Sequence, residues 1–468
     1  MSHAAVELKF GTSGLRGLGK DLDRETCYAY VGAFLAMLER RGERLEAVCI
    51  GFDLRASSTG IALYCAEAVA ARGLKVINAG PVPTPALARY ALMRRLPALM
   101  ITASHNPAEH NGIKFYRPDG ELAKADEAPI KALLGAPLPA PRPLTPPPLV
   151  TEVAREYIES FVDLFGPRAL AGLRLGVDQH SAVGRDLLMD VLQSLGAECT
   201  VTRRSDTFIA VDTEAVDETY LGMARDWLDA GYFDAIVSTD GDGDRPLLID
   251  GEGRQVLGDS LGILAAHALG YGKVVTPVSS TSAVEGSGFF STVARTRIGS
   301  PFVIEAMNTL AGEGGAVAGF EGNGGFLTEG VHFWRDRLVP ALPTRDAILP
   351  IVAVLSAALE KGMTVADLVG KLPARAKATG RIADVDTLRG ARWIEGLVAA
   401  PNTLKLLSST AQVETVDGAK FVLADGNSLH LRLSGNAPEL RLYVETSSAA
   451  SAAILLKNAM IEARNALM

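Results

Sequence analysis

The sequence predicts an α/β fold, with three similar units on mostly parallel sheets and a smaller antiparallel α+β unit at the C-terminus. Three stretches run strand, helix, strand, and such alternation is typical of parallel sheets covered by helices. The final part instead has strands in which apolar and polar residues alternate, as in an antiparallel sheet. A length of 468 residues also corresponds to roughly three or four domains rather than one core.

Each of the three units begins with an apolar strand, passes through a helix and returns to a strand. Gly196 follows the helix of the second unit and suits the C-cap position. We predict the strand, helix and second strand at 48–52, 57–72 and 75–77 in the first unit, at 173–177, 182–195 and 198–202 in the second, and at 273–278, 282–288 and 292–294 in the third.

The C-terminal unit has two segments, 428–433 and 440–445, that alternate between apolar and polar residues like half-exposed strands. A helix over 449–467 follows them without a Gly or Pro stop. The domain boundary is clearest at 135–150, where seven prolines predict an extended, stiff linker. We place the domains at 1–150, 151–253, 254–369 and 370–468.

Charge and cysteine usage limit the class of function. A net charge of −8 argues against a nucleic-acid binder, because a long phosphate backbone would not be neutralised. A small anionic substrate would need Arg and Lys gathered locally. The four cysteines lie far apart without a CxxC pair, which favours buried free thiols over disulfides or a zinc site.

Nothing in the sequence predicts a membrane segment. Glu7 and Lys9 interrupt a signal-like apolar run at the N-terminus. The longest apolar run, 348–359, is too short to cross a bilayer and predicts a buried helix. We therefore expect a cytoplasmic protein without membrane association.

An acidic loop, Asp240-Gly241-Asp242-Gly243-Asp244-Arg245, follows a predicted strand over 233–238. Ligands of open α/β sheets bind beyond the carboxyl ends of the strands, and three carboxylates there could converge on one hard cation such as Mg²⁺. An EF-hand would need Gly at its sixth and Glu at its twelfth position, where this chain has Arg245 and Gly251. The alternative to a cation site is a solvated acidic turn. In such a turn, no positive charge would offset the repulsion among the three carboxylates.

A serine loop, Ile-Thr-Ala-Ser-His-Asn-Pro at 101–107, follows the apolar residues 97–100. A strand that ends in a sharp turn would present the hydroxyl of Ser104, although an ST-turn or a helix N-cap would also suit this serine. Lys114 follows closely and can stabilise charge or, with a lowered pKa, move protons. His105 is distinguished from the other histidines by its adjacency to Ser104. Together with the acidic loop, these residues indicate metal-assisted phosphoryl transfer.

Three glycine-containing loops offer groups that bind phosphates or sugars, although each also fits an ordinary turn. The N-terminal loop, 10–17, has free backbone N–H groups and Arg16. The phosphate loop, 432–438, lies between two predicted strands, and its arginine, hydroxyl, amide and N–H groups fit a dianionic phosphate. The sugar loop, 319–325, offers Glu321 and Asn323 for hydrogen bonds to sugar hydroxyls.

These motifs resemble those of the α-D-phosphohexomutases over essentially the whole chain and in the same order. The serine loop, the acidic loop and the N-terminal loop carry the resemblance. It implies three α/β domains with mixed, mostly parallel sheets and a C-terminal antiparallel α+β domain, in agreement with the unit count above.

The resemblance also implies a role for each loop. It implies that Mg²⁺ is held by Ser104, Asp240, Asp242 and Asp244. It implies that Ser104 carries a phosphoryl group, and that the other groups acting at the transfer site are Lys114, as general acid or base, Arg16 and His105. It assigns substrate binding to Arg245, Arg297, Gly299, Ser300, Glu321, Asn323, Arg432, Ser434, Gly435, Asn436 and Arg441.

The implied reaction passes a phosphoryl group from Ser104 to a hexose phosphate, through a hexose 1,6-bisphosphate that returns its other phosphate to the enzyme. The implied partners are hexose phosphates, and the implied assembly is a monomer or a homodimer. The sugar loop and phosphate loop depart from the commonest family patterns, Gly-Glu-x-Ser-Gly-His and Ser-Gly-Thr-Glu-Pro, and resemble those of certain bacterial phosphomannomutases. The implied substrates are mannose 1-phosphate and mannose 6-phosphate. The glucose and glucosamine phosphate mutases of the family and a sugar-phosphate phosphatase remain alternatives.

Overall fold

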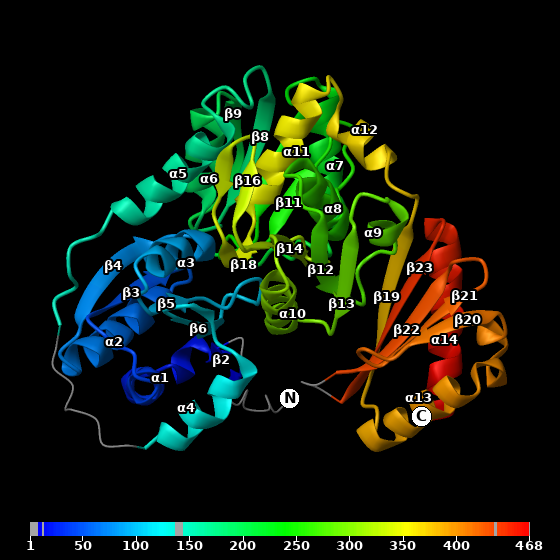
Figure 1. The fold of residues 1–468 in the computed structure, drawn as a ribbon, viewed down its shortest axis with the longest axis horizontal. Coiled ribbons are helices and arrows are strands. Elements are labelled where there is room, and N and C mark those ends of the chain that lie inside the picture. The colour runs from blue at the N-terminus through cyan, green and yellow to red at the C-terminus, as the bar shows by residue number, and fades with distance from the viewer. Residues whose placement is uncertain (1–7, 12–13, 136–143, 435–437, 468) are drawn as a thin grey trace.

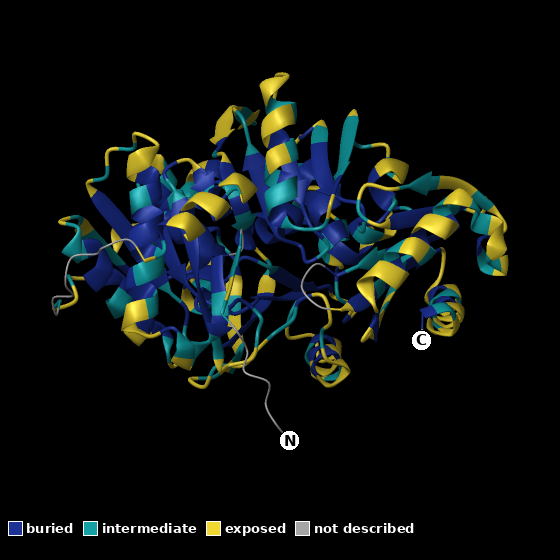
Figure 2. Cartoon of the chain, turned by 90° about the horizontal axis from the view of Figure 1, so that it is seen from below, coloured by how far each residue is buried: buried dark blue, intermediate teal, exposed yellow. Residues whose placement is uncertain are grey.

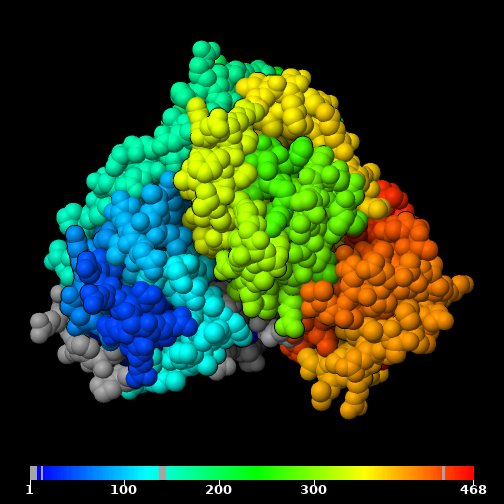
Figure 3. All heavy atoms as spheres, viewed as in Figure 1, coloured from blue at the N-terminus to red at the C-terminus, as the bar shows by residue number. Residues whose placement is uncertain are grey.

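The computed structural model describes residues 8–11, 14–135, 144–434 and 438–467. In this described part, four sheet-containing units follow one another from the blue N-terminal unit to the red C-terminal unit (Figure 1). Figure 3 shows the N-terminal and C-terminal units on opposite sides of the green and yellow third unit. The predicted class, α/β units followed by an antiparallel α+β unit, is confirmed.

The first unit has the strand order β1-β2-β6-β5-β3-β4, with β7 paired to β6. Its strands are β1 (Lys9–Gly11), β2 (Gly14–Leu18), β3 (Ala47–Phe52), β4 (Lys75–Pro81), β5 (Ala98–Ile101), β6 (His110–Arg117) and β7 (Gly120–Glu121). Its helices are α1 (Arg24–Arg40), α2 (Ser58–Ala71), α3 (Thr84–Met93) and α4 (Glu127–Leu133). The serine loop begins where β5 ends.

The second unit has the strand order β11-β10-β8-β9. Its strands are β8 (Arg174–His180), β9 (Glu198–Arg204), β10 (Ala235–Thr239) and β11 (Pro246–Ile249), and its helices are α5 (Glu152–Phe165), α6 (Arg185–Ser194) and α7 (Glu218–Asp229). Gly196 has a φ of 93° just after α6, so it ends this helix as predicted.

The third unit has the strand order β13-β12-β14-β15-β18, beside a separate hairpin of β16 and β17. Its strands are β12 (Lys273–Pro277), β13 (Thr292–Thr296), β14 (Val317–Phe320), β15 (Phe326–Glu329), β16 (His332–Trp334), β17 (Arg337–Val339) and β18 (Leu342–Asp346). Its helices are α8 (Gly258–Ala268), α9 (Ala283–Gly286), α10 (Ser300–Gly312), α11 (Ile348–Glu360) and α12 (Val365–Gly370).

The fourth unit has the antiparallel order β19-β23-β22-β21-β20. Its strands are β19 (Ala376–Ala383), β20 (Thr410–Glu414), β21 (Ala419–Leu423), β22 (Ser428–Leu433) and β23 (Glu439–Thr446), and its helices are α13 (Thr387–Ala399) and α14 (Ala449–Leu467). The strands and helix predicted for this unit are confirmed.

The predicted strand, helix and strand of each α/β unit all fall on observed elements, and their strands pair in parallel. Antiparallel strands then extend each sheet, to a greater extent than the sequence indicated. Two of these extensions are hairpins, β10–β11 and β14–β15, whose turns are the acidic loop and the sugar loop. Hairpins are missed more easily than crossovers because a short turn leaves no helical periodicity to detect.

The first three units share one continuous core, in which Tyr90, Tyr157 and Ile351 are buried together. Residues 348–358 of α11 are all buried, which confirms the predicted buried helix. Figure 2 shows many of the inner strands in dark blue, whereas yellow marks the outer faces of helices. All four cysteines are free, as predicted. Within the described residues, no helix has the length and apolar character needed to cross a membrane.

The fourth unit has its own core, around Phe421 and Leu442, and meets the third unit through polar groups. Lys420 Nζ donates to the carbonyl of Val278 at 3.2 Å, and Glu445 accepts from the backbone N–H of Ser282. The prediction of a half-exposed strand over 428–433 is wrong for residues 428–431, which are all buried. Leu429 and Leu431 belong to the core of the fourth unit, and Ser428 and His430 share a cavity with residues 278–280 of the third unit.

Candidate active site

The serine loop is a strained turn whose backbone carbonyls are bound by a buried arginine. Ser104 has a φ of 54°, a left-handed conformation that is uncommon for a residue with a side chain. Arg55 donates to the carbonyls of Ser104 at 2.8 Å and Asn106 at 2.7 Å, and its own charge is paired with Asp53 at 3.0 Å. The sequence analysis missed Arg55, which has no motif around it.

The turn places the Ser104 hydroxyl against the acidic loop. Ser104 Oγ donates to Asp240 Oδ2 at 2.7 Å, and the Ser104 N–H donates to Thr102 Oγ1 at 2.9 Å. The end of β5 and the β10–β11 hairpin therefore meet, as the phosphoryl-transfer hypothesis requires.

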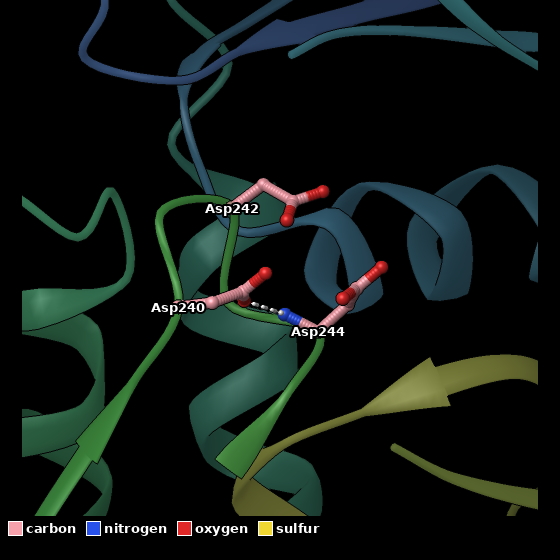
Figure 4. A group of neighbouring side chains, drawn as sticks. All are labelled: Asp240, Asp242 and Asp244. Atoms are coloured by element: carbon pink, nitrogen blue, oxygen red, sulfur yellow. Dashed lines mark hydrogen bonds between the residues drawn. The ribbon is translucent and has the colours of Figure 1, made fainter. Parts of the chain in front are cut away.

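The three carboxylates of the acidic loop converge. Each of Asp240, Asp242 and Asp244 is buried, and one oxygen from each lies within 4.8 Å of the others. Figure 4 shows them on one turn, where the Asp244 N–H donates to Asp240 Oδ1 at 3.2 Å. The predicted convergence is confirmed.

The donor set of this turn fits a metal ion. The Oδ1 atoms of Asp242 and Asp244 are buried and have no hydrogen-bond partner among the described residues, although unpaired buried carboxylate oxygens are costly. Burial and the charges of Asp242 and Asp244 hold the pKa of Asp240 well above its usual range. A bound cation would satisfy the orphan oxygens and relieve the repulsion.

Lys114 and Arg345 supply the positive charge around this turn. Lys114 Nζ lies 2.5 Å from Asp242 Oδ2 and 2.7 Å from Asp244 Oδ2. Burial alone would lower the pKa of Lys114, but the two carboxylates outweigh it and raise this pKa. The carboxylates therefore favour the ammonium form of Lys114.

Two other predicted residues, Arg245 and His105, lie near the three carboxylates. Arg245 Nε is 3.8 Å from Asp244 Oδ1 and 4.0 Å from Asp240 Oδ2. Burial and the nearby charge of Arg245 lower the pKa of His105 to about 4. His105 is consequently neutral at neutral pH and adds no positive charge beside Ser104.

The sugar loop is joined to the acidic loop by Arg345, which the sequence analysis missed. Arg345 Nη2 donates to Asp244 Oδ2 at 2.7 Å, and Nη1 donates to Glu321 Oε2 at 3.2 Å. Ser300 Oγ donates to the same oxygen of Glu321 at 2.7 Å. Asn323 Oδ1 accepts from the N–H of Gly325 at 2.9 Å, so the loop is internally braced.

A central cavity of about 510 Å³ lies beside the serine loop and the sugar loop, and residues of all four units line it. The fourth unit contributes Lys377, Thr379 and Tyr443, and the second contributes Glu214, none of which the sequence analysis singled out. The predicted residues that line this cavity are Arg16, Ser104, His105, Lys114, Arg245, Gly299, Ser300, Glu321 and Asn323.

The other predicted substrate-binding residues lie outside the central cavity. Arg297 and Arg432 line a separate cavity of about 270 Å³, where Arg432 Nε pairs with Asp417 Oδ2 at 2.8 Å. Arg441 lines a third cavity of about 640 Å³ and pairs with Glu439 at 2.7 Å. Carboxylates therefore hold Arg432 and Arg441 outside the central cavity, whereas the Arg297 guanidinium lies over the Phe302 ring.

The remainder of the phosphate loop is only partly described. Ser434 is buried, and its N–H donates to the carbonyl of Glu439 at 2.9 Å. The predicted residues Gly435 and Asn436 lie outside the described residues.

The chain matches models of one family along its length. Models of phosphoglucomutase/phosphomannomutase α/β/α domains I, II and III match residues 7–136, 155–253 and 257–376, and the model of the C-terminal domain matches 364–461.

Among known proteins, the chain is 39% identical over 466 residues to a phosphomannomutase of Salmonella muenchen, covering 98% of this chain and 96% of that protein. It is 40% identical over 460 residues to a phosphomannomutase of Sinorhizobium fredii, covering 96% and 97%. A phosphoglucosamine mutase of Herminiimonas arsenicoxydans is 29% identical over 463 residues, covering 94% and 95%.

The fold is shared with a crystal structure of a phosphoglucomutase/phosphomannomutase family protein from Burkholderia thailandensis. The TM-score is 0.79 at 22% identity, covering 98% of this chain and 97% of that one. From its domains and its relatives, the chain belongs to the phosphoglucomutase/phosphomannomutase family of isomerase-class enzymes.

Proposed function

We propose that the chain is a phosphomannomutase, which interconverts mannose 1-phosphate and mannose 6-phosphate through a phosphoserine at Ser104 and a hexose 1,6-bisphosphate. The observation that carries this proposal is the 2.7 Å contact of Ser104 Oγ with Asp240, within a cluster of three buried carboxylates. A presented hydroxyl beside a cation site on a cavity wall is the arrangement that phosphoryl transfer needs.

In the first half-reaction, the free hydroxyl oxygen of the hexose phosphate attacks the phosphorus on Ser104. The bond from phosphorus to Ser104 Oγ breaks as the bond to the sugar oxygen forms, and the hydroxyl proton ends on Ser104. Asp240, Asp242, Asp244 and an oxygen on Ser104 would hold Mg²⁺, which would neutralise charge on the transferring group.

The surrounding cations orient and stabilise the transferring phosphoryl group. Lys114 lies within 2.7 Å of two carboxylates of the acidic loop, and Arg16 lines the same cavity. Both can donate to phosphoryl oxygens, where fixed positive charge lowers the barrier. His105, neutral at neutral pH, would contribute a hydrogen bond rather than a charge.

In the second half-reaction, the bisphosphate turns over and returns its other phosphoryl group to Ser104. Glu321, Asn323, Gly299, Ser300 and Arg245 would hold the sugar in either orientation. Since all four units line the cavity, closure of the fourth unit would exclude water from the intermediate.

The phosphate that is not reacting needs its own site, and we propose the phosphate loop with Arg441 and Arg297. Arg432 and Arg441 are directly opposed on β22 and β23. Like charges in such a position repel unless an anion lies between them. A substrate phosphate would replace the carboxylates of Asp417 and Glu439 that pair with these arginines here, joined by Ser434, Gly435 and Asn436.

Mannose is the proposed sugar because two phosphomannomutases are about 40% identical to the chain, whereas the phosphoglucosamine mutase is 29% identical. A coupled mutase assay tests this choice, with Mg²⁺, a trace of hexose bisphosphate and the 1-phosphates of mannose, glucose or glucosamine in turn. A clear preference for mannose 1-phosphate is expected. Equal rates with glucose would indicate dual specificity, preference for glucosamine would reassign the substrate, and free phosphate without isomerisation would indicate a phosphatase.

A further inference from the structure

Two charged side chains on the cavity wall have no part in the reaction above. Glu214 lies in the loop before α7, and Lys377 lies on β19, so they come from the second and fourth units. Both line the central cavity and the neighbouring cavity of about 640 Å³, together with Gly322 of the sugar loop. The walls of the two cavities therefore meet at these three residues.

The two charges converge on one point beside the sugar loop. A methyl group added at Gly322 would lie 3.3 Å from Glu214 Oε1 and 3.8 Å from Lys377 Nζ. A carboxylate only accepts hydrogen bonds and an ammonium only donates them. A sugar hydroxyl in this space can donate to Glu214 and accept from Lys377 at the same time.

Both groups have hydrogen-bonding capacity to spare. Lys377 Nζ is anchored to Asp259 Oδ2 at 2.6 Å, which occupies one of its three N–H donors. The Glu214 carboxylate is exposed within the cavity, and no hydrogen bond joins it to another described residue. In the sugar loop, by contrast, Oε2 of Glu321 already accepts from Ser300 and Arg345.

We propose that Glu214 and Lys377 contact the hexose and set its preference between mannose and glucose, an inference that rests on the proposed function. The two sugars differ only in the direction of the 2-hydroxyl, so contacts to the 3- and 4-hydroxyls cannot distinguish them. A fixed donor and acceptor accommodate a hydroxyl in one direction only. A polar site of this kind discriminates because the wrong epimer leaves the two charged partners without the hydrogen bonds that the right epimer makes.

The decisive variant is Glu214→Ala, since the Glu214 side chain makes no hydrogen bond within the described residues and its loss should not disturb folding. We expect the ratio of kcat/KM for mannose 1-phosphate to that for glucose 1-phosphate to fall at least about tenfold, through a loss with mannose. Glu214→Gln should give an intermediate ratio. The control Glu218→Ala, at an exposed glutamate at the start of α7, should leave the ratio unchanged.

Lys377→Met provides a second test and should shift the ratio in the same direction. Lys377→Met also removes the ion pair of Asp259, so Glu214→Ala is the deciding variant should Lys377→Met fail to fold. Equal losses with both sugars, or an unchanged ratio in Glu214→Ala, would overturn the inference.

The proposed function is judged separately, on the wild type. Absence of turnover with mannose 1-phosphate would reject the phosphomannomutase assignment. The inference would then be decided by calorimetric affinities of wild type and Glu214→Ala for mannose 6-phosphate and glucose 6-phosphate. A changed affinity ratio would support it, and an unchanged ratio would overturn it.

Discussion

Ser104 Oγ donates a hydrogen bond of 2.7 Å to Asp240 Oδ2, and this bond joins the first unit to the second. It aligns the presented hydroxyl with the cluster of three buried carboxylates. The proposed carrier of the phosphoryl group and the proposed cation site are thus one structure, built from two loops that are distant in the sequence.

Replacing Ser104 by alanine should lower kcat by about 10³-fold or more, because the carrier of the phosphoryl group is lost. Mass spectrometry should find no phosphorylated protein after incubation with hexose 1,6-bisphosphate. Ser160→Ala, at a half-buried serine of α5, is the control and should keep both activity and phosphorylation. Near-normal turnover by Ser104→Ala would refute the proposed role.

Removal of divalent cations by a chelator should abolish turnover, and added Mg²⁺ should restore it. Mg²⁺ at a hundred times its Kd should also stabilise the wild type by about 2.7 kcal/mol, measured as a rise in Tm. Asp242→Asn should lose both effects, whereas Asp229→Asn, at an exposed residue of α7, should retain them. Full activity in the chelated enzyme would argue against a cation site at the acidic loop.

Arg345→Met should lower kcat about 10²-fold, because Arg345 joins Asp244 of the acidic loop to Glu321 of the sugar loop. It should also lower the free energy of unfolding by about 3 kcal/mol, since two buried carboxylates each lose a charged partner. Arg345→Lys should restore stability more than kcat, because one ammonium cannot reproduce both contacts. Steady-state kinetics and urea unfolding measure the two effects, and equal recovery of both would contradict this account.

Arg432→Ala should raise the KM for hexose phosphates about tenfold or more by removing a charge-assisted contact to phosphate. Phosphorylation of Ser104 by hexose bisphosphate should remain detectable. Arg392→Ala, at an exposed arginine of α13, is the matched control. An unchanged KM would place the second phosphate site away from Arg432.

Stability should fall as the pH falls below about 6.5, the usual pKa of an unfolded histidine. Burial lowers the pKa values of both His180 and His430 in the folded protein. The unfolded state therefore binds more protons below this pH, and the free energy of unfolding decreases as pH decreases.

The variant His430→Gln isolates one histidine, because glutamine can still donate to the carbonyl of Asp417 that contacts His430 Nε2. Urea unfolding at pH 7.5 and 5.5 should show a decrease about 1 kcal/mol smaller in the variant than in the wild type. The same pH dependence in both proteins would mean that His430 does not titrate differently on folding.

The parts of the fold and site that were predicted correctly depend on local patterns. The apolar strand at 173–177 and the helix after it follow from periodicity, and both were found. The alternation of Asp and Gly at 240–244 placed three carboxylates on one turn. These features depend only on residues that are close together in the sequence, so the order of residue types is enough to predict them.

Other parts could not be predicted because they depend on contacts between distant segments. Arg345 has no motif around it, and only the position of β18 beside the two loops makes it a bridge. Arg432 was assigned to substrate binding from its loop, but its pairing with Asp417 on a cavity separate from the central one appears only in the structure. Such side-chain orientations depend on charges that neighbouring loops supply. A local sequence pattern does not show which loops will be neighbours.

By itself, the sequence determined the order of the α/β units, the antiparallel C-terminal unit and the chemistry that each loop offers. Only the tertiary structure decided which loops meet. Ser104 and Asp240 come together because the first three units share a continuous core. Glu214 and Lys377 converge on Gly322 because the fourth unit docks through polar contacts. The positions of these loops relative to one another depend on apolar burial and charge pairing between distant segments. The residue pattern of a single segment does not contain these long-range interactions.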